Sequence, residues 1–207
     1  MNHNPNYVYA EALLLLHTTK SLIIDIYAGK ENAIARDEMR LDIEERHLDL
    51  RGQSTPNDPD YYVRKALSEL PNAEHREYVN RCSYWVTNRL ELGTGDKWVY
   101  CFYFERDQYK ATRDKKWCWK CNIGRTRNDP FGRIGKQIRD APKYPIIPLL
   151  IRTDDEKALE RHIHDTLKAE RRHLTNTNTN EDFLTCPSEV ARIFFDSPFF
   201  SGKKISL

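Results

Sequence analysis

Residues 98–104, with the sequence WVYCFYF, constrain the fold more than any other stretch of the chain. All seven side chains are aromatic, aliphatic or cysteine, and aromatic and β-branched residues favour strands. Because successive side chains of a strand point to opposite faces, the even and odd positions form two apolar faces. The even face consists of Trp98, Tyr100, Phe102 and Phe104, and the odd face of Val99, Cys101 and Tyr103. The stretch predicts a strand that is largely covered on both faces.

Two further strands are expected after this one. The first is centred on residues 117–123, and the second covers residues 145–152. Pro148 places the latter strand at a sheet edge, because proline cannot donate a hydrogen bond to a neighbouring strand. Residues 105–116 between the first two strands are expected to form a charged loop.

Three helices are predicted in the same half of the chain. Asp129 and Pro130 suit the cap and the first position of a helix, a capping box at 153–156 opens the next, and Pro187 starts the last. Together these elements predict an α+β fold, with a small, mostly antiparallel three-stranded sheet flanked by helices.

The N-terminal half, from residue 7 to about 92, is predicted to be helical, because apolar residues recur there at spacings near three to four. One of these helices is expected to open at Pro71 and to continue through Tyr78, Cys82, Trp85 and Leu90. The glycine-containing turn at 93–96 then predicts a boundary. We expect a helical N-terminal region at 1–93 and a second domain at 97–207.

The charge of the chain is small in total but unevenly distributed. The net charge of the 207 residues is +2, which argues against a uniformly basic nucleic-acid wrapper. Residues 105–143, however, carry twelve basic and five acidic side chains, a net of +7, whereas residues 31–50 carry a net of −4. A basic segment interleaved with aromatic residues is typical of contact with a phosphate backbone, although a solvated charged face would look the same.

Membrane and export signals are not expected. The longest purely aliphatic run is Leu13 to Leu16, far short of the roughly 20 apolar residues of a membrane helix. The N-terminus lacks the basic start and apolar core of an export signal, so we expect a cytoplasmic protein with reduced cysteines.

Cys118 and Cys121 have the CxxC spacing of a zinc knuckle, but no second pair follows them. In a strand these two side chains would point to opposite faces. If the stretch is irregular, Cys101, Cys186 or a histidine could complete a site.

Four pieces of the sequence together resemble the GIY-YIG endonuclease superfamily, in its phage and bacterial branch. They are Val99-Tyr100-Cys101, Asn122-Ile123-Gly124-Arg125-Thr126, Asp129-Pro130 with Arg133, and Ala158-Leu159-Glu160 with His164. The likeness covers roughly residues 98–195 and leaves the N-terminal region unexplained.

The resemblance implies hydrolysis of DNA phosphodiesters with one Mg²⁺ or Mn²⁺ ion. It implies that Glu160 is the metal ligand, that Arg133 holds the phosphate, and that Tyr100 orients water or relays a proton. At Gly124 bare backbone would let the strand end approach the site. His164 would orient the metal-bound water or carry a proton. Contacts with the DNA would come from Arg125, Arg127 and Lys136.

Asn122 departs from this pattern, because the superfamily usually has tyrosine or lysine there. A carboxamide cannot act as a base near neutral pH, so Lys120 on the same strand face, Tyr100 or His164 would have to replace it. This departure motivates an alternative, a catalytically degenerate domain that binds nucleic acid or protein. The N-terminal helices would recognise a target, form a homodimer or bind a partner protein, and a regulatory factor that works through these helices is a third possibility.

Overall fold

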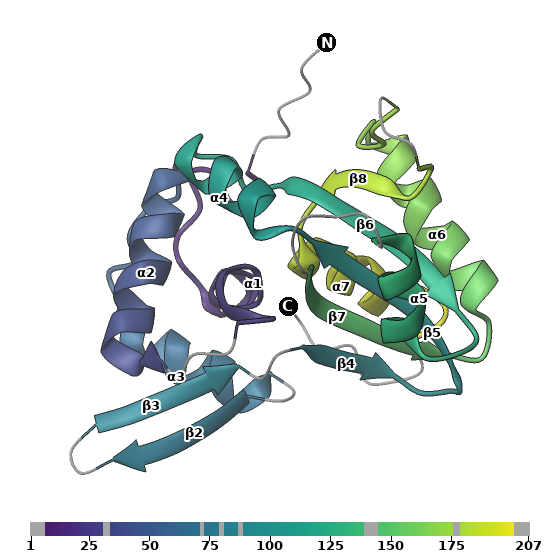
Figure 1. The fold of residues 1–207 in the computed structure, drawn as a ribbon. Coiled ribbons are helices and arrows are strands. Elements are labelled where there is room, and N and C mark those ends of the chain that lie inside the picture. The colour runs from purple at the N-terminus through teal and green to yellow at the C-terminus, as the bar shows by residue number, and fades with distance from the viewer. Residues whose placement is uncertain are drawn as a thin grey trace.

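The computed structural model describes residues 7–30, 34–70, 73–78, 81–86, 89–138, 145–175 and 179–200. Its main feature is a five-stranded sheet with the strand order β4-β7-β5-β6-β8 (Figure 1). The strands are β4 (Leu90–Gly93), β5 (Lys97–Tyr103), β6 (Trp119–Thr126), β7 (Ile146–Thr153) and β8 (Asp182–Thr185). β4 is parallel to β7, and the other neighbours are antiparallel. The α+β class is confirmed, but the sheet is larger than the expected three strands and is mixed.

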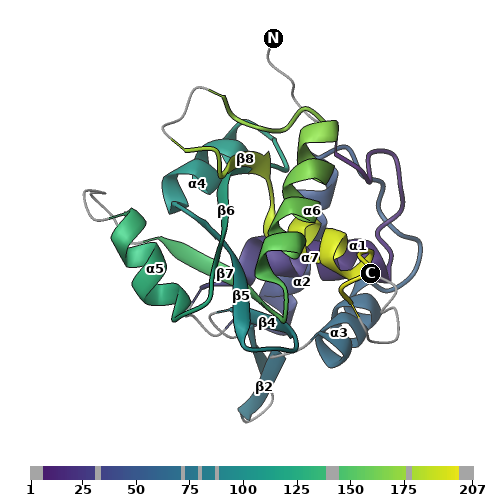
Figure 2. The same cartoon turned by 90° about the vertical axis from the view of Figure 1, so that its right-hand side faces the viewer.

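Helices cover both faces of this sheet. Helix α5 (Pro130–Gln137) lies on one side, and α6 (Glu156–Ala169) and α7 (Pro187–Phe195) lie on the other (Figure 2). The alternation within β5 explains the arrangement. Tyr100 and Phe102 pack with Ile134 of α5, whereas the odd positions of β5 belong to the larger core on the opposite face. The predicted coverage of both strand faces is confirmed.

The helix starts predicted at Asp129-Pro130 and at Pro187 are confirmed, whereas the capping box predicted at 153–156 is wrong in its cap residue. The Asp129 carboxylate accepts hydrogen bonds from the backbone N–H groups of Phe131, at 3.3 Å, and Gly132, at 2.6 Å, with Pro130 at the first helical position. At the start of α6 the cap is Asp155, which accepts from the N–H of Ala158 at 3.0 Å, and not Thr153, because β7 continues through Thr153. These caps fix the first turns of the two helices that carry most of the candidate site.

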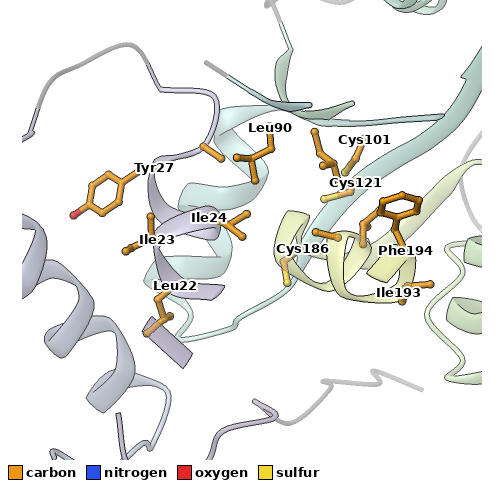
Figure 3. Close-up of a cluster of buried hydrophobic side chains, with 14 of the residues drawn as sticks. Leu22, Ile23, Ile24, Tyr27, Leu90, Cys101, Cys121, Cys186, Ile193 and Phe194 are labelled. Carbon is orange, nitrogen blue, oxygen red and sulfur yellow. The ribbon is translucent and has the colours of Figure 1, made fainter. Parts of the chain in front are cut away.

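Three N-terminal helices pack beside the sheet: α1 (Leu16–Tyr27), α2 (Arg36–Asp49) and α3 (Pro59–Glu69). Figure 3 shows Leu22 and Ile24 of α1 in the same apolar cluster as Cys101 and Cys121 of the sheet. The N-terminal helices and the sheet therefore share one core. The division of the chain into 1–93 and 97–207 stays a prediction.

The helix expected from Pro71 to Leu90 is wrong for the described residues. β2 (Ala73–Tyr78) and β3 (Arg81–Val86) form an antiparallel hairpin, and the short strand β1 (Ile34–Ala35) joins it in the order β1-β3-β2. Pro71 itself lies outside the described residues. The sequence of β3, RCSYWV, is rich in strand-forming residues, and pairing with β2 outweighs the helical spacing of the apolar positions.

The charged loop expected at 105–116 is instead mostly helical, as α4 (Glu105–Arg113). This helix has no apolar stripe, because one of its two buried residues is polar. The Gln108 amide donates to the backbone oxygen of Asp25 in α1 at 2.6 Å, and Ala111 is the other buried residue. Most residues of this helix are charged or polar, so its composition is the same as that of a solvated loop.

The edge position expected from Pro148 is wrong, because β7 lies between β4 and β5. The pairing of β5 with β7 shifts register between Cys101 and Tyr103, and β4 pairs with β7 only from Leu149 onward. Pro148 therefore occupies a gap in both ladders, where its missing N–H group is tolerated. Among the described residues, no helix is both long and apolar enough to cross a lipid bilayer.

Candidate active site at the edge of strand β6

Tyr100 and Gly124 form the floor of the candidate site. The two residues are paired across β5 and β6. A Cβ atom at position 124 would lie 2.5 Å from the Tyr100 Oη and 2.7 Å from its Cζ, so the phenol ring crosses the bare backbone of Gly124. Position 124 was expected to let the strand end approach the site closely. In the structure it is the Tyr100 ring that comes close, and it leaves no room for a side chain larger than glycine.

Gly124→Ala is expected to lower the free energy of unfolding by about 1–3 kcal/mol, because Tyr100 must leave its place to make room for the methyl group. Urea denaturation would measure the change. Gly135→Ala is the matched control, since its added Cβ meets no atom within 4 Å and alanine is the better helix former. Equal stability of Gly124→Ala and wild type would contradict the close approach.

The Tyr100 hydroxyl is buried against protein groups. Tyr100 is 1% exposed, and its hydroxyl donates to the Gln137 Oε1 at 2.9 Å. Burial, followed by the charge of Glu181, raises the pKa of Tyr100 to about 12, although Arg133 opposes this. The phenol is therefore protonated at neutral pH and orients neighbouring groups rather than acting as a base.

Gln137 and Glu181 belong to the site, although sequence reasoning did not assign them a role. The Gln137 Nε2 donates to the Glu181 carboxylate at 2.7 Å, which extends the hydrogen-bond chain from Tyr100 through Gln137 to Glu181. Gln137 lies one helical turn after Arg133, and this spacing could have indicated it. Glu181 directly precedes β8 and is 44 residues from Gln137 in the sequence, so only the tertiary structure brings the two together.

Glu160 lies within electrostatic reach of Tyr100 but is paired with Arg125. Its side chain is 17% exposed and accepts from the Arg125 Nε at 2.8 Å. Burial raises the pKa of Glu160, and the charges of Glu181 and Glu156 add to this, whereas Arg125 lowers it. Glu156 and Glu160 are one helical turn apart on α6, and both have Arg125 as a partner, at 3.7 and 2.8 Å.

Arg127, expected to contact DNA, is held by Glu156. The Arg127 Nε donates to Glu156 at 2.9 Å, and this hydrogen bond lowers the pKa of Glu156. Arg125 and Lys97 approach the same carboxylate at 3.7 and 3.9 Å. By contrast, Arg133 and Lys136 are exposed on α5. Two of the four expected phosphate contacts are thus already neutralised by carboxylates.

Among the described residues, no hydrogen bond joins His164 or Lys120 to Tyr100, Arg133 or Glu160. The His164 Nε2 bonds to the backbone oxygen of Ile123 at 2.9 Å, and burial lowers the pKa of its imidazole. Lys120 forms an ion pair of 2.8 Å with Asp182, which also accepts from the Asn122 amide at 3.1 Å. Neither side chain is placed to replace the base that Asn122 cannot supply.

The donor set fits a hard divalent cation better than a soft one. Glu160 offers carboxylate oxygen, the kind of ligand that Mg²⁺ prefers, and Glu156 shares its partner Arg125. The Arg125 guanidinium already lies against Glu160 as a positive charge. A cation is therefore electrostatically suited to this position.

The chain matches no protein-family model, no curated protein and no solved structure. The site must therefore be interpreted from its own geometry.

Proposed function

We propose that this chain is a metal-dependent DNA endonuclease that hydrolyses phosphodiester bonds at a GIY-YIG-type site. The supporting observation is that charged groups from two distant helices act on one buried phenol. After the larger effect of burial, the guanidinium of Arg133 in α5 lowers the pKa of Tyr100 in β5, and the carboxylate of Glu160 in α6 raises it.

Each residue has a distinct part in the proposed reaction. Arg133 is exposed and would bind a non-bridging phosphate oxygen, stabilising the charge that develops there. The Glu160 carboxylate would hold Mg²⁺, which supplies further neutralisation of the phosphate. Because the Tyr100 hydroxyl gives its hydrogen to Gln137, its oxygen would accept a hydrogen bond from a water molecule and so orient it.

The surroundings of Arg133 suit a nucleic acid. Phe131 and Lys136 are exposed on the same short helix, and the Arg89 guanidinium stacks 4.2 Å from the centre of the Phe131 ring. Exposed cations and an aromatic face are the usual components of a surface that contacts phosphates and bases.

Arg125→Ala is expected to raise the affinity for Mn²⁺ about threefold to tenfold, because the mutation removes a cation that competes for Glu160. Isothermal titration of the DNA-free protein would measure this. Arg127→Ala is the control, since Arg127 pairs with Glu156 and not with Glu160. Weaker Mn²⁺ binding by Arg125→Ala than by Arg127→Ala would contradict the assignment of Glu160.

A second candidate function is a catalytically degenerate domain that binds nucleic acid or protein. The observation that favours it is that Asn122 donates a hydrogen bond to Asp182 and that Lys120 forms an ion pair with the same residue. Neither side chain is then placed to take a proton from an attacking water molecule. In this case Arg133 would hold a phosphate without hydrolysis. A regulatory role of the N-terminal helices is the third alternative.

One experiment separates these functions. Supercoiled plasmid is incubated with the protein in Mg²⁺, in Mn²⁺ and in EDTA, and binding is measured in parallel by gel shift. The nuclease proposal expects nicked or linear plasmid only with metal. Binding without cleavage would favour the degenerate domain, and neither binding nor cleavage would favour the regulatory factor.

A further inference from the structure

A buried group of sulfur and oxygen donors lies away from the candidate active site. Cys118 immediately precedes β6, Cys186 is the cap residue of α7, and Glu189 is in the first turn of α7. Their two Sγ atoms and a carboxylate oxygen all lie within 4.8 Å of one another. The three residues are 2%, 0% and 3% exposed, so water does not solvate these donors.

One carboxylate oxygen in this group has no hydrogen-bond donor. The Glu189 Oε2 accepts from the Thr185 hydroxyl at 2.5 Å and from Arg172. The Oε1 is buried without a hydrogen bond, and the Arg192 Nη2 lies 3.8 Å from it. An unsatisfied buried carboxylate oxygen destabilises the fold unless another group, such as a metal ion, binds it.

Asp25 of α1 lies beside this group, outside the set of donors that are all within 4.8 Å of one another. Its carboxylate accepts from the backbone N–H of Ser188 at 3.0 Å and from the Ser188 hydroxyl at 2.8 Å, two residues after Cys186. Each carboxylate oxygen has two lone pairs, so the contacts to Ser188 can persist while one oxygen binds a metal.

We propose that Cys118, Cys186 and Glu189 bind one Zn²⁺ ion and that the neighbouring Asp25 carboxylate shifts toward them to become the fourth ligand. Two thiolates and two carboxylates form a four-coordinate set of the kind zinc accepts. Zn²⁺ displaces two thiol protons, which pass to solvent, so the net charge of the buried group is unchanged. Arg172 remains in place as a donor to the Cys118 Sγ, at 3.5 Å, and to Glu189.

This site differs from the CxxC knuckle considered from the sequence. Cys121 belongs to β6 and its thiol donates to the backbone oxygen of Thr185 at 3.6 Å, whereas Cys118 lies before the strand and faces Cys186. The partner of Cys118 is therefore the cysteine at the start of α7. A bound ion would join α1, the beginning of β6 and α7.

The test is a Co²⁺ titration of the full chain after treatment with a chelator. Wild type is expected to develop a thiolate-to-cobalt charge-transfer band and the visible bands of tetrahedral Co²⁺, saturating at one equivalent and reversed by Zn²⁺. Cys118→Ala and Cys186→Ala should lose the charge-transfer intensity. Cys121→Ala, another buried cysteine of the same CxxC, should keep it.

Two results would overturn the proposal: a wild type without the charge-transfer band, or loss of the band in Cys121→Ala as complete as in Cys118→Ala. Because a cysteine variant could unfold, Glu189→Gln and Asp25→Asn, which preserve side-chain size, provide a second test. While circular dichroism shows them folded, each should bind Co²⁺ at least about tenfold more weakly. Unchanged affinity in both would reject the four-ligand site.

Discussion

Glu160→Gln is expected to lower the rate of Mg²⁺-dependent plasmid cleavage by about 100- to 1,000-fold. Loss of a metal-binding carboxylate removes several kcal/mol of charge stabilisation in the transition state, and each 1.4 kcal/mol is about a factor of ten in rate. The amide has the same size and its oxygen can still accept from Arg125, so the fold is preserved. The measurement is initial rates of nicking at saturating Mg²⁺.

Two accompanying measurements make this result specific. Asp165→Asn neutralises an exposed carboxylate on the same helix and should cleave at the wild-type rate. DNA binding by Glu160→Gln should be unchanged or slightly tighter, because a negative charge near the phosphate has been removed. Wild-type cleavage by Glu160→Gln would show that Glu160 is not the metal ligand.

Phe183→Ala is expected to lower the free energy of unfolding by about 3–5 kcal/mol. Phe183 of β8 is fully buried, and its ring lies 4.7 Å from that of His164 and 5.2 Å from that of His173, measured between centroids. β8 is only four residues long, so this side chain provides much of its attachment to the core. Urea denaturation monitored by circular dichroism would give the value.

The control for this variant is Phe131→Ala, which truncates a phenylalanine that is 40% exposed and should change the stability by less than about 1 kcal/mol. A loss in Phe183→Ala no larger than in Phe131→Ala would mean that β8 is not anchored through Phe183. Because Glu181 directly precedes β8, the folded fraction of Phe183→Ala should also cleave more slowly than wild type.

Local patterns were sufficient to predict some elements and insufficient for others. The alternation in 98–104 and the Asp129-Pro130 cap are properties of neighbouring residues, and the structure confirms both. β4 and β8, with four residues each, are stabilised by pairing with distant strands. Such short segments carry too little periodicity to be identified without their partners.

The same distinction holds for the candidate site. Tyr100 and Gly124 could be predicted together because both lie on strands with a readable pattern. His164 shares a helical stripe with Glu160, but its ring is turned to the backbone of Ile123, and no sequence pattern reports such a contact. Gln137 and Glu181 meet only when α5 and the start of β8 come together in the folded chain.

The two faces of the sheet also differ in how firmly they hold their helices. On the α5 side, the cluster of buried apolar side chains consists of Tyr100, Phe102, Ile134 and Leu150. Only Ile134 of this cluster belongs to α5. By contrast, α6 inserts Leu159, Ile163 and Leu167 into the larger core on the other face. Local opening requires less free energy where fewer apolar contacts are lost. The backbone amides of α5 should therefore exchange with solvent deuterium before those of α6. The helix that carries Arg133 and Gln137 can then change position when a ligand binds, whereas the helix that carries Glu160 stays in place.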